Sequence, residues 1–131
     1  MRIAAAQIKP IAGDIAKNIV AHCSLIERAV AQHSDLIFFP ELSLAGYEPH
    51  LAKDLAMDQH DSRLSLFQEL SDAHRIIIGI GLPLIAVYGI HIGMIFVQPD
   101  QPRASYSKQQ LHSDELPFFV AGDQQRLLKA N

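Results

Sequence analysis

Short apolar runs alternate with an amphipathic stretch in the first part of the chain. Residues 2–8 are mostly apolar and end at Lys9-Pro10, and residues 36–39 are a second apolar run that ends at Pro40. Between them, apolar side chains recur every three or four residues, at Ile15, Ile19, Cys23, Ile26 and Val30. This spacing predicts an amphipathic helix that begins after Asp14, a good N-cap residue, and ends near His33. Strand, helix and strand in this order predict a βαβ unit on a parallel sheet.

The rest of the chain predicts one more long helix and three strands. Residues 40–60 are irregular, with at most one short helix over 51–57. The helix is expected over 61–74, with Leu64, Phe67 and Leu70 facing inward. Strands are expected over 76–81, 90–97 and 103–107, the first of them central because it is apolar on both faces and the last two paired as a hairpin. The pattern predicts no further strand or helix after Gly122, so the chain is expected to contain about half of the sheet.

Composition limits the function classes. The chain has 131 residues, of which 49% are hydrophobic and 19% charged, and this fits one compact domain. The net charge is -3 and the chain has no basic run, so neither nucleic acid nor an anionic membrane is expected as a partner. No apolar run reaches the roughly 18 residues of a membrane span, and the amino terminus is too short a run for a signal peptide. A single cysteine excludes an internal disulfide and favours a reducing compartment, so we expect a cytoplasmic protein.

Three charged residues are candidates for chemistry because of their positions. Glu41 follows the buried strand that ends at Phe39, where open α/β sheets place active sites, and its neighbours would partly desolvate it. Lys108 follows the last predicted strand, and beside Glu41 it could stabilise an oxyanion. Glu115 precedes an apolar patch and could orient the lysine. Each residue could also be a solvated surface charge. That explanation is the commoner one for a lone lysine and for an acidic pair such as Asp114-Glu115.

Other chemistries lack their motifs. There is no G-x-S-x-G elbow around Ser43, and residues 79–81 lack the third glycine and the helix of a dinucleotide site. The seven histidines show no metal-binding spacing, so each is expected to be a surface or capping residue and no metal is expected. Cys23 lies on the apolar stripe of the first helix, where a buried thiol is inert. It is therefore not expected to be a nucleophile.

Several stretches in order resemble the nitrilase superfamily of carbon–nitrogen hydrolases. They are residues 2–7, residues 38–42 with Gly46-Tyr47 beyond them, residues 106–111, and Glu115 with residues 119–122. The resemblance covers the whole chain. It implies an α/β fold, half of a four-layer α-β-β-α sandwich, with residues 1–131 as a single partial domain that lacks the C-terminal half.

The resemblance also implies roles. The general-base glutamate of the family corresponds to Glu41, its oxyanion-stabilising lysine to Lys108, and a second glutamate beside them to Glu115, and Tyr47 is expected to contact substrate. The family hydrolyses non-peptide C–N bonds of nitriles and amides without cofactor or metal, through a cysteine that follows a further strand. This chain ends before that position, so we expect it to be inactive alone.

Two hypotheses remain open at this stage. In the first, the chain is a hydrolase fragment that a second chain completes, or one that was truncated. In the second, it is a non-catalytic assembly or binding module. An open apolar sheet face would drive its association into a homo-oligomer or with a complementing chain. The residues expected on that face are Ile78, Ile80, Ile92, Met94 and Phe96.

Overall fold

The computed structural model describes residues 1–128, and within them five strands form one mixed sheet in the order β1-β2-β3-β4-β5. The strands are β1 (Ile3–Ala5), β2 (Leu36–Phe38), β3 (Ile77–Ala86), β4 (Gly89–Val97) and β5 (Ala104–Ser107). The helices are α1 (Ile15–Ala31), η1 (Pro49–Leu51), α2 (Ala52–Leu55), η2 (Ser62–Leu64) and α3 (Ser65–His74).

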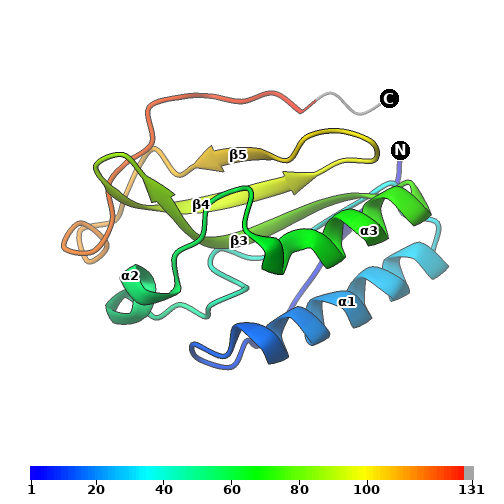
Figure 1. Ribbon diagram of the computed structural model, residues 1–131, viewed down its shortest axis with the longest axis horizontal. Coiled ribbons are helices and arrows are strands. Elements are labelled where there is room, and N and C mark those ends of the chain that lie inside the picture. Colours follow the sequence, from blue (N-terminus) through cyan, green and yellow to red (C-terminus); the bar gives the residue numbers. More distant parts are fainter. Residues whose placement is uncertain (129–131) are drawn as a thin grey trace.

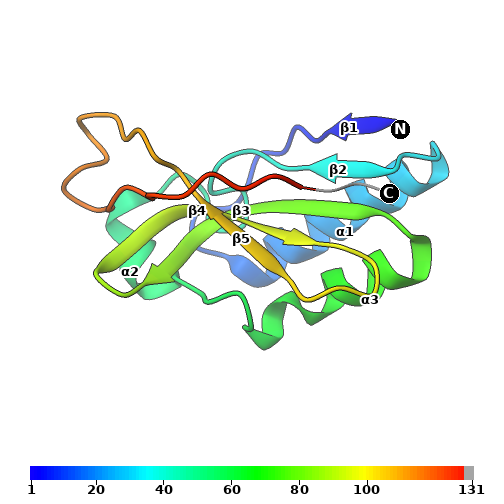
Figure 2. The ribbon, with the colours of Figure 1, turned by 90° about the horizontal axis from the view of Figure 1, so that it is seen from above.

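The sheet is parallel on one side and antiparallel on the other. Strands β1, β2 and β3 run in the same direction, and β4 and β5 alternate beyond them. The predicted βαβ unit and the β4–β5 hairpin are therefore confirmed. Helices α1 and α3 lie side by side on one face, and residues 123–128 run across the other face without regular structure (Figures 1 and 2).

Helix α1 begins as the sequence predicts but buries a different stripe. The Oδ1 of Asp14 accepts a hydrogen bond from the N–H of Lys17 at 3.1 Å, which is an N-cap. Ile19, Cys23 and Val30 are only partly buried at the edge of the core. The buried residues are Ile15, Asn18, His22, Ile26 and Ala29. The helix is thus rotated so that two polar side chains face the sheet.

Strand β3 is longer than the predicted strand and forms a second hairpin with β4. Pairing continues from Ile78↔Val97 to Ala86↔Gly89. A proline is tolerated inside this strand because Pro83 lies beyond the end of β2 and so meets no β2 partner. Its carbonyl instead accepts a hydrogen bond from the N–H of Met57 at 3.0 Å.

The main core lies between the sheet and the two long helices. Ile78 and Ile80 of β3 are fully buried in it, together with Phe67 of α3. The expectation that Ile78 and Ile80 line an open face is therefore wrong. The run Ile76-Ile77-Ile78-Gly79-Ile80-Gly81 is apolar at every position, so its pattern could not decide which residues face the helices.

The opposite face carries a smaller set of apolar side chains. A Cβ added at Gly79 would lie 3.2 to 3.4 Å from atoms of Met94, Phe96 and Phe38, so these three side chains share that face. Phe38 is 41% exposed. The prediction holds for Met94 and Phe96, but Ile92 is buried in a second small core with Leu42, Ala52 and Phe119.

None of the helices within residues 1–128 has the length and apolar character needed to cross a bilayer.

The assignment of the two faces is testable with one substitution made at two places on β3. Ile80→Ala should lower the free energy of unfolding by about 2–5 kcal/mol, because it leaves a cavity under the helices. Ile85→Ala, at a side chain on the other face that is 53% exposed, should cost less than about 1 kcal/mol. Urea unfolding measures both variants, and equal losses would contradict the assignment.

Candidate active site

Two strand ends bring charged residues to the same edge of the sheet. Strands β2 and β3 are parallel, and β4 is antiparallel to both β3 and β5. Strands β2 and β5 therefore run in the same direction. Glu41 follows β2 and Lys108 follows β5, so both residues leave the sheet at one end. Figure 2 shows β2 pointing toward the end of the sheet where α2 and the loop after β5 lie.

Lys108 lies between two carboxylates. Its Nζ is 3.0 Å from Oε2 of Glu41 and 2.8 Å from Oε1 of Glu115. The backbone of Lys108 is also fixed, because its N–H donates to the carbonyl of Ile92 at 2.9 Å and its carbonyl accepts from Gly122 at 2.8 Å. The predicted proximity of Glu41, Lys108 and Glu115 is present in the structure.

Glu115 is the buried member of the cluster, with 2% of the residue exposed. Burial by itself would raise the pKa of its carboxyl, but the hydrogen bonds from Lys108 and from the N–H of His112 outweigh it and hold that pKa below its usual value. The hydroxyl of Tyr47 also donates to Oε1 of Glu115 at 3.2 Å. Tyr47, a predicted substrate contact, therefore adjoins the cluster.

The charges in this cluster reinforce one another. The hydrogen bond to Glu115 raises the pKa of the Lys108 ammonium against the opposing effect of burial, and Glu41 adds to the increase. Lys108 therefore remains a cation, as a group that stabilises an oxyanion must. The Glu41 side chain is 38% exposed and that of Glu115 only 3%. Glu41 is thus the carboxylate that an arriving reactant could reach.

Cys23 does not have the properties of an activated nucleophile. It lies on α1 and packs against the main core between the helices and the sheet. Burial raises the pKa of its thiol, and the Glu27 carboxylate raises that pKa further. Its thiolate is correspondingly scarce at neutral pH.

The sequence reasoning missed a buried polar cluster behind Glu41. His22 was expected to be a surface or capping residue, but it is fully buried, with its ring stacked on Phe39 at a centroid distance of 4.1 Å. Its Nε2 lies 2.9 Å from the hydroxyl of Ser43, which is buried as well. The available signal was the spacing of residues 15, 18, 22, 26 and 29, which fits one helix face if polar residues are admitted.

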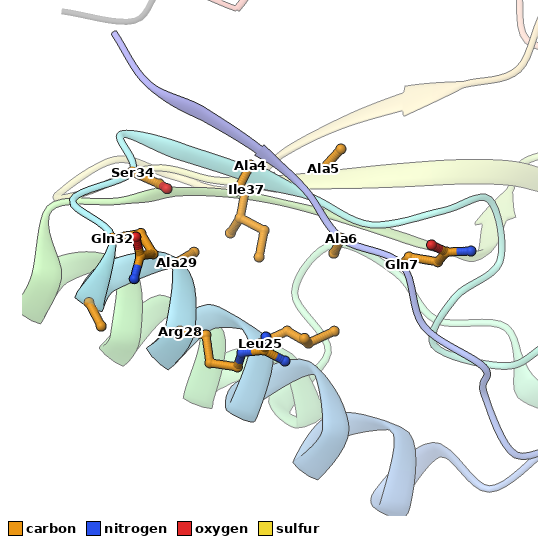
Figure 3. Close-up of a pocket in the computed structure, with 11 residues that line it drawn as sticks. Ala4, Ala5, Ala6, Gln7, Leu25, Arg28, Ala29, Gln32, Ser34 and Ile37 are labelled. Atoms are coloured by element: carbon orange, nitrogen blue, oxygen red, sulfur yellow. The ribbon is translucent and has the colours of Figure 1, made fainter.

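A cavity of about 520 Å3 lies elsewhere, between α1 and the edge strand β1. Figure 3 shows Ala4, Ala6 and Gln7 on one side of it and Leu25 and Arg28 on the other. None of the three charged residues of the candidate site lines this cavity. Among the residues described, no three His, Cys, Asp or Glu side chains gather as metal ligands.

The sequence and the fold are those of one hydrolase family. The family model for carbon-nitrogen hydrolases matches residues 2–128, and the chain belongs to this family. An amidase from Nesterenkonia sp. AN1 has a similar structure, with a TM-score of 0.80 at 26% sequence identity. The match covers 95% of this chain and 50% of the amidase.

Two further relatives are similar to the chain over nearly all of its length. A CN-hydrolase superfamily protein from Xanthomonas campestris, which has an arsenic adduct in its active site, shares the fold at a TM-score of 0.86 and 22% identity, over 98% of this chain and 48% of its own. A glutamine-dependent NAD(+) synthetase from Xylella fastidiosa strain Temecula1 is 27% identical over 135 residues, which is 100% of this chain and 23% of the synthetase. The chain thus spans about half of the similar structures and carries half of their sandwich.

The buried His22 predicts how stability changes with pH. In the folded chain burial lowers the pKa of its ring from 6.5 to about 4, so between these values the unfolded chain binds the proton more readily. This contribution to stability is complete above about pH 6.5 and is lost as the pH falls toward 4, by roughly 3 kcal/mol.

Urea unfolding at pH 7.5 and pH 4.5 should therefore show a smaller loss in His22→Gln than in the parent chain, because the variant lacks this group. His74→Gln, at an exposed histidine at the end of α3, should behave like the parent chain. Equal pH dependence in all three chains would contradict a neutral buried His22.

Proposed function

We propose that this chain contributes the general base and the oxyanion-stabilising cation of a hydrolase that cleaves non-peptide C–N bonds through a cysteine. The observation that carries this proposal is the position of Lys108 Nζ, 3.0 Å from Glu41 and 2.8 Å from Glu115. This ion cluster lies at the ends of strands and differs from isolated surface ion pairs because one of its members, Glu115, is almost completely buried.

The proposed reaction has two halves. Glu41 accepts the proton of a thiol, and the thiolate attacks the carbon of the C–N bond while the Lys108 ammonium stabilises the developing oxyanion. Protonated Glu41 returns the proton to the leaving nitrogen, which departs as ammonia or an amine. Glu41 then takes a proton from water, and the resulting hydroxide attacks the thioester carbon. The C–S bond breaks, the acyl group leaves as a carboxylic acid, and Glu41 returns its proton to the departing thiolate.

Glu115 and Tyr47 act differently from Glu41 in this proposal. Glu115 is buried and already bonded to Lys108, His112 and Tyr47, so its role is to hold the ammonium in place and charged. Tyr47 is 47% exposed, and we place it at the rim, where a substrate could contact it.

The nucleophile in this proposal lies outside the printed sequence. The one cysteine of the sequence, Cys23, packs against the main core, and burial raises the pKa of its thiol. A variant of the Nesterenkonia amidase carries the acetamide moiety of fluoroacetamide on its active site cysteine. We therefore propose that a further polypeptide segment or a complementing chain supplies the thiol.

The proposed substrate is a small amide, with nitriles as a second option. The relatives named above include an amidase and a synthetase that depends on glutamine, whose side chain ends in a primary carboxamide. Neither cofactor nor metal takes part in the proposed steps.

The isolated chain should release no ammonia from simple amides or nitriles, because covalent turnover requires the thiol. The chain completed by a cysteine-bearing segment, sought first in the DNA directly downstream, should release ammonia. In that protein Glu41→Gln should lower kcat/KM by about 10²–10⁴-fold, the range expected for a general base.

Glu69→Gln, at an exposed glutamate on α3, is the matched control and should keep the parent rate. Retained turnover in Glu41→Gln would remove Glu41 from the mechanism. Turnover by the isolated chain that disappears in Glu41→Gln would instead place a nucleophile within these 131 residues.

A second candidate function is non-catalytic assembly, and the apolar side chains opposite the helices favour it. Phe38, Met94 and Phe96 gather around Gly79 on that face, and Ile3 at the sheet edge is 53% exposed. In this reading the chain pairs with a second copy or with a complementing chain over this face.

Analytical ultracentrifugation tests the assembly function. The purified chain should sediment as a dimer or larger species, and Phe38→Lys should shift it toward monomer because a charge cannot be buried there without a partner. Val20→Lys, at a side chain on α1 that is 71% exposed, is the control and should not change the sedimentation. A monomeric parent chain that binds no hydrophobic dye would contradict this function.

A further inference from the structure

Glu41 stands on a tight turn that is fixed to β3 by its backbone. The N–H of Ser43 donates to the carbonyl of Pro40 at 3.1 Å, and the N–H of Leu44 donates to the carbonyl of Gly81 at 3.0 Å. Leu42, directly after Glu41, has a φ of 54°, a conformation that costs a leucine free energy and needs support from its surroundings.

The turn approaches β3 more closely than a side chain would allow. A Cβ added at Gly81 would lie 2.2 Å from the carbonyl oxygen of Pro40 and 2.8 Å from the backbone nitrogen of Leu42. Gly81 is thus the contact surface against which the backbone on both sides of Glu41 packs. Small movements of this turn would move the carboxylate relative to Lys108.

His22 contacts this turn from the helix side. The carbonyl of Asn18 can only accept a hydrogen bond, so the Nδ1 of His22, 2.6 Å away, carries the proton. The Nε2 of the neutral ring is then an acceptor, and the hydroxyl of Ser43 donates to it at 2.9 Å. That hydroxyl is 3.4 Å from the carbonyl of Gly81, so the bond to His22 is the better one.

Asn18 supports the same turn from one helical turn earlier. Its side-chain nitrogen donates to the carbonyl of Leu44 at 2.9 Å and to the carbonyl of Ile11 at 2.8 Å. Asn18, His22 and Ser43 are all almost completely buried, and buried polar groups with defined partners fix geometry more strictly than apolar contacts do.

We propose that the His22–Ser43 hydrogen bond is a positioning device that holds the turn at Gly81 so that Glu41 reaches Lys108. His22 and Ser43 are positioning residues and do not touch the reacting atoms. The proposal rests on the proposed function only in naming Glu41 as the base, since the geometric claim concerns the Glu41–Lys108 pair itself.

Competitive acetylation of lysines, read by mass spectrometry, tests this without any turnover. The rate at Lys108 relative to the exposed Lys53 reports how well the ammonium is paired. Glu41→Gln should raise the relative rate roughly two- to fivefold, as expected for the loss of a partly exposed ion pair. Ser43→Ala should raise it by a similar factor, and Ser43→Ala in the Glu41→Gln background should add nothing.

Ser71→Ala is the matched control, because it also removes a buried hydroxyl, which donates to the carbonyl of Ile76 at 2.7 Å under α3. It should leave the relative rate at Lys108 unchanged. His22→Phe keeps a ring against Phe39 and removes the bond to Ser43, so it should reproduce the effect of Ser43→Ala. If one of these two variants fails to fold, the other still tests the proposal.

The proposal would be overturned by no change at Lys108 in Ser43→Ala or His22→Phe, by an equal change in Ser71→Ala, or by an additive change in the double variant. An unchanged rate in Glu41→Gln would overturn it too, because the pair would then not exist in solution. If the protein completed by a cysteine-bearing segment never hydrolysed an amide, the proposed function would be refuted and this result would stand.

Discussion

One ammonium held between two carboxylates is the interaction on which the candidate site depends. Lys108 joins the turn after β2 to the loop after β5, which the sheet alone would only bring to the same end. Burial opposes the charge on Glu115 and on Lys108, so each stabilises the charged form of the other. Lys108 therefore offsets part of the free-energy cost of burying the Glu115 carboxylate.

The two carboxylates are held by different means. Glu115 is fixed through its side chain, by Lys108, Tyr47 and the N–H of His112. Glu41 is fixed through its backbone, since the turn that carries it packs directly on Gly81 and no side chain could fit between them. This arrangement suits the proposed role of Glu41 as a base, because a carboxylate that is held by its backbone stays free to exchange partners.

The sequence predicted the elements and the charged cluster better than it predicted orientation. Strand ends marked by Pro40 and Lys108 located the site because parallel topology brings such ends together. The buried side of α1 was misjudged because Asn18 and His22 lie at its centre, and a search for hydrophobic residues leaves these polar residues out. The face of β3 was misjudged because an uninterrupted apolar run gives no alternation to interpret. The first of these errors hid the contact between α1 and the turn of Glu41.

Exposure increases outward through the cluster, and this order bears on how a reaction could use it. Glu115 is buried, Lys108 is intermediate with 30% of its side chain exposed, and Glu41 is the most exposed of the three. The charges that must be fixed are thus assembled within one half of the sandwich. The proposed thiol and substrate would then meet a base and a cation whose positions are already set, so the completing segment needs to supply the sulfur and the pocket walls and not the charge arrangement.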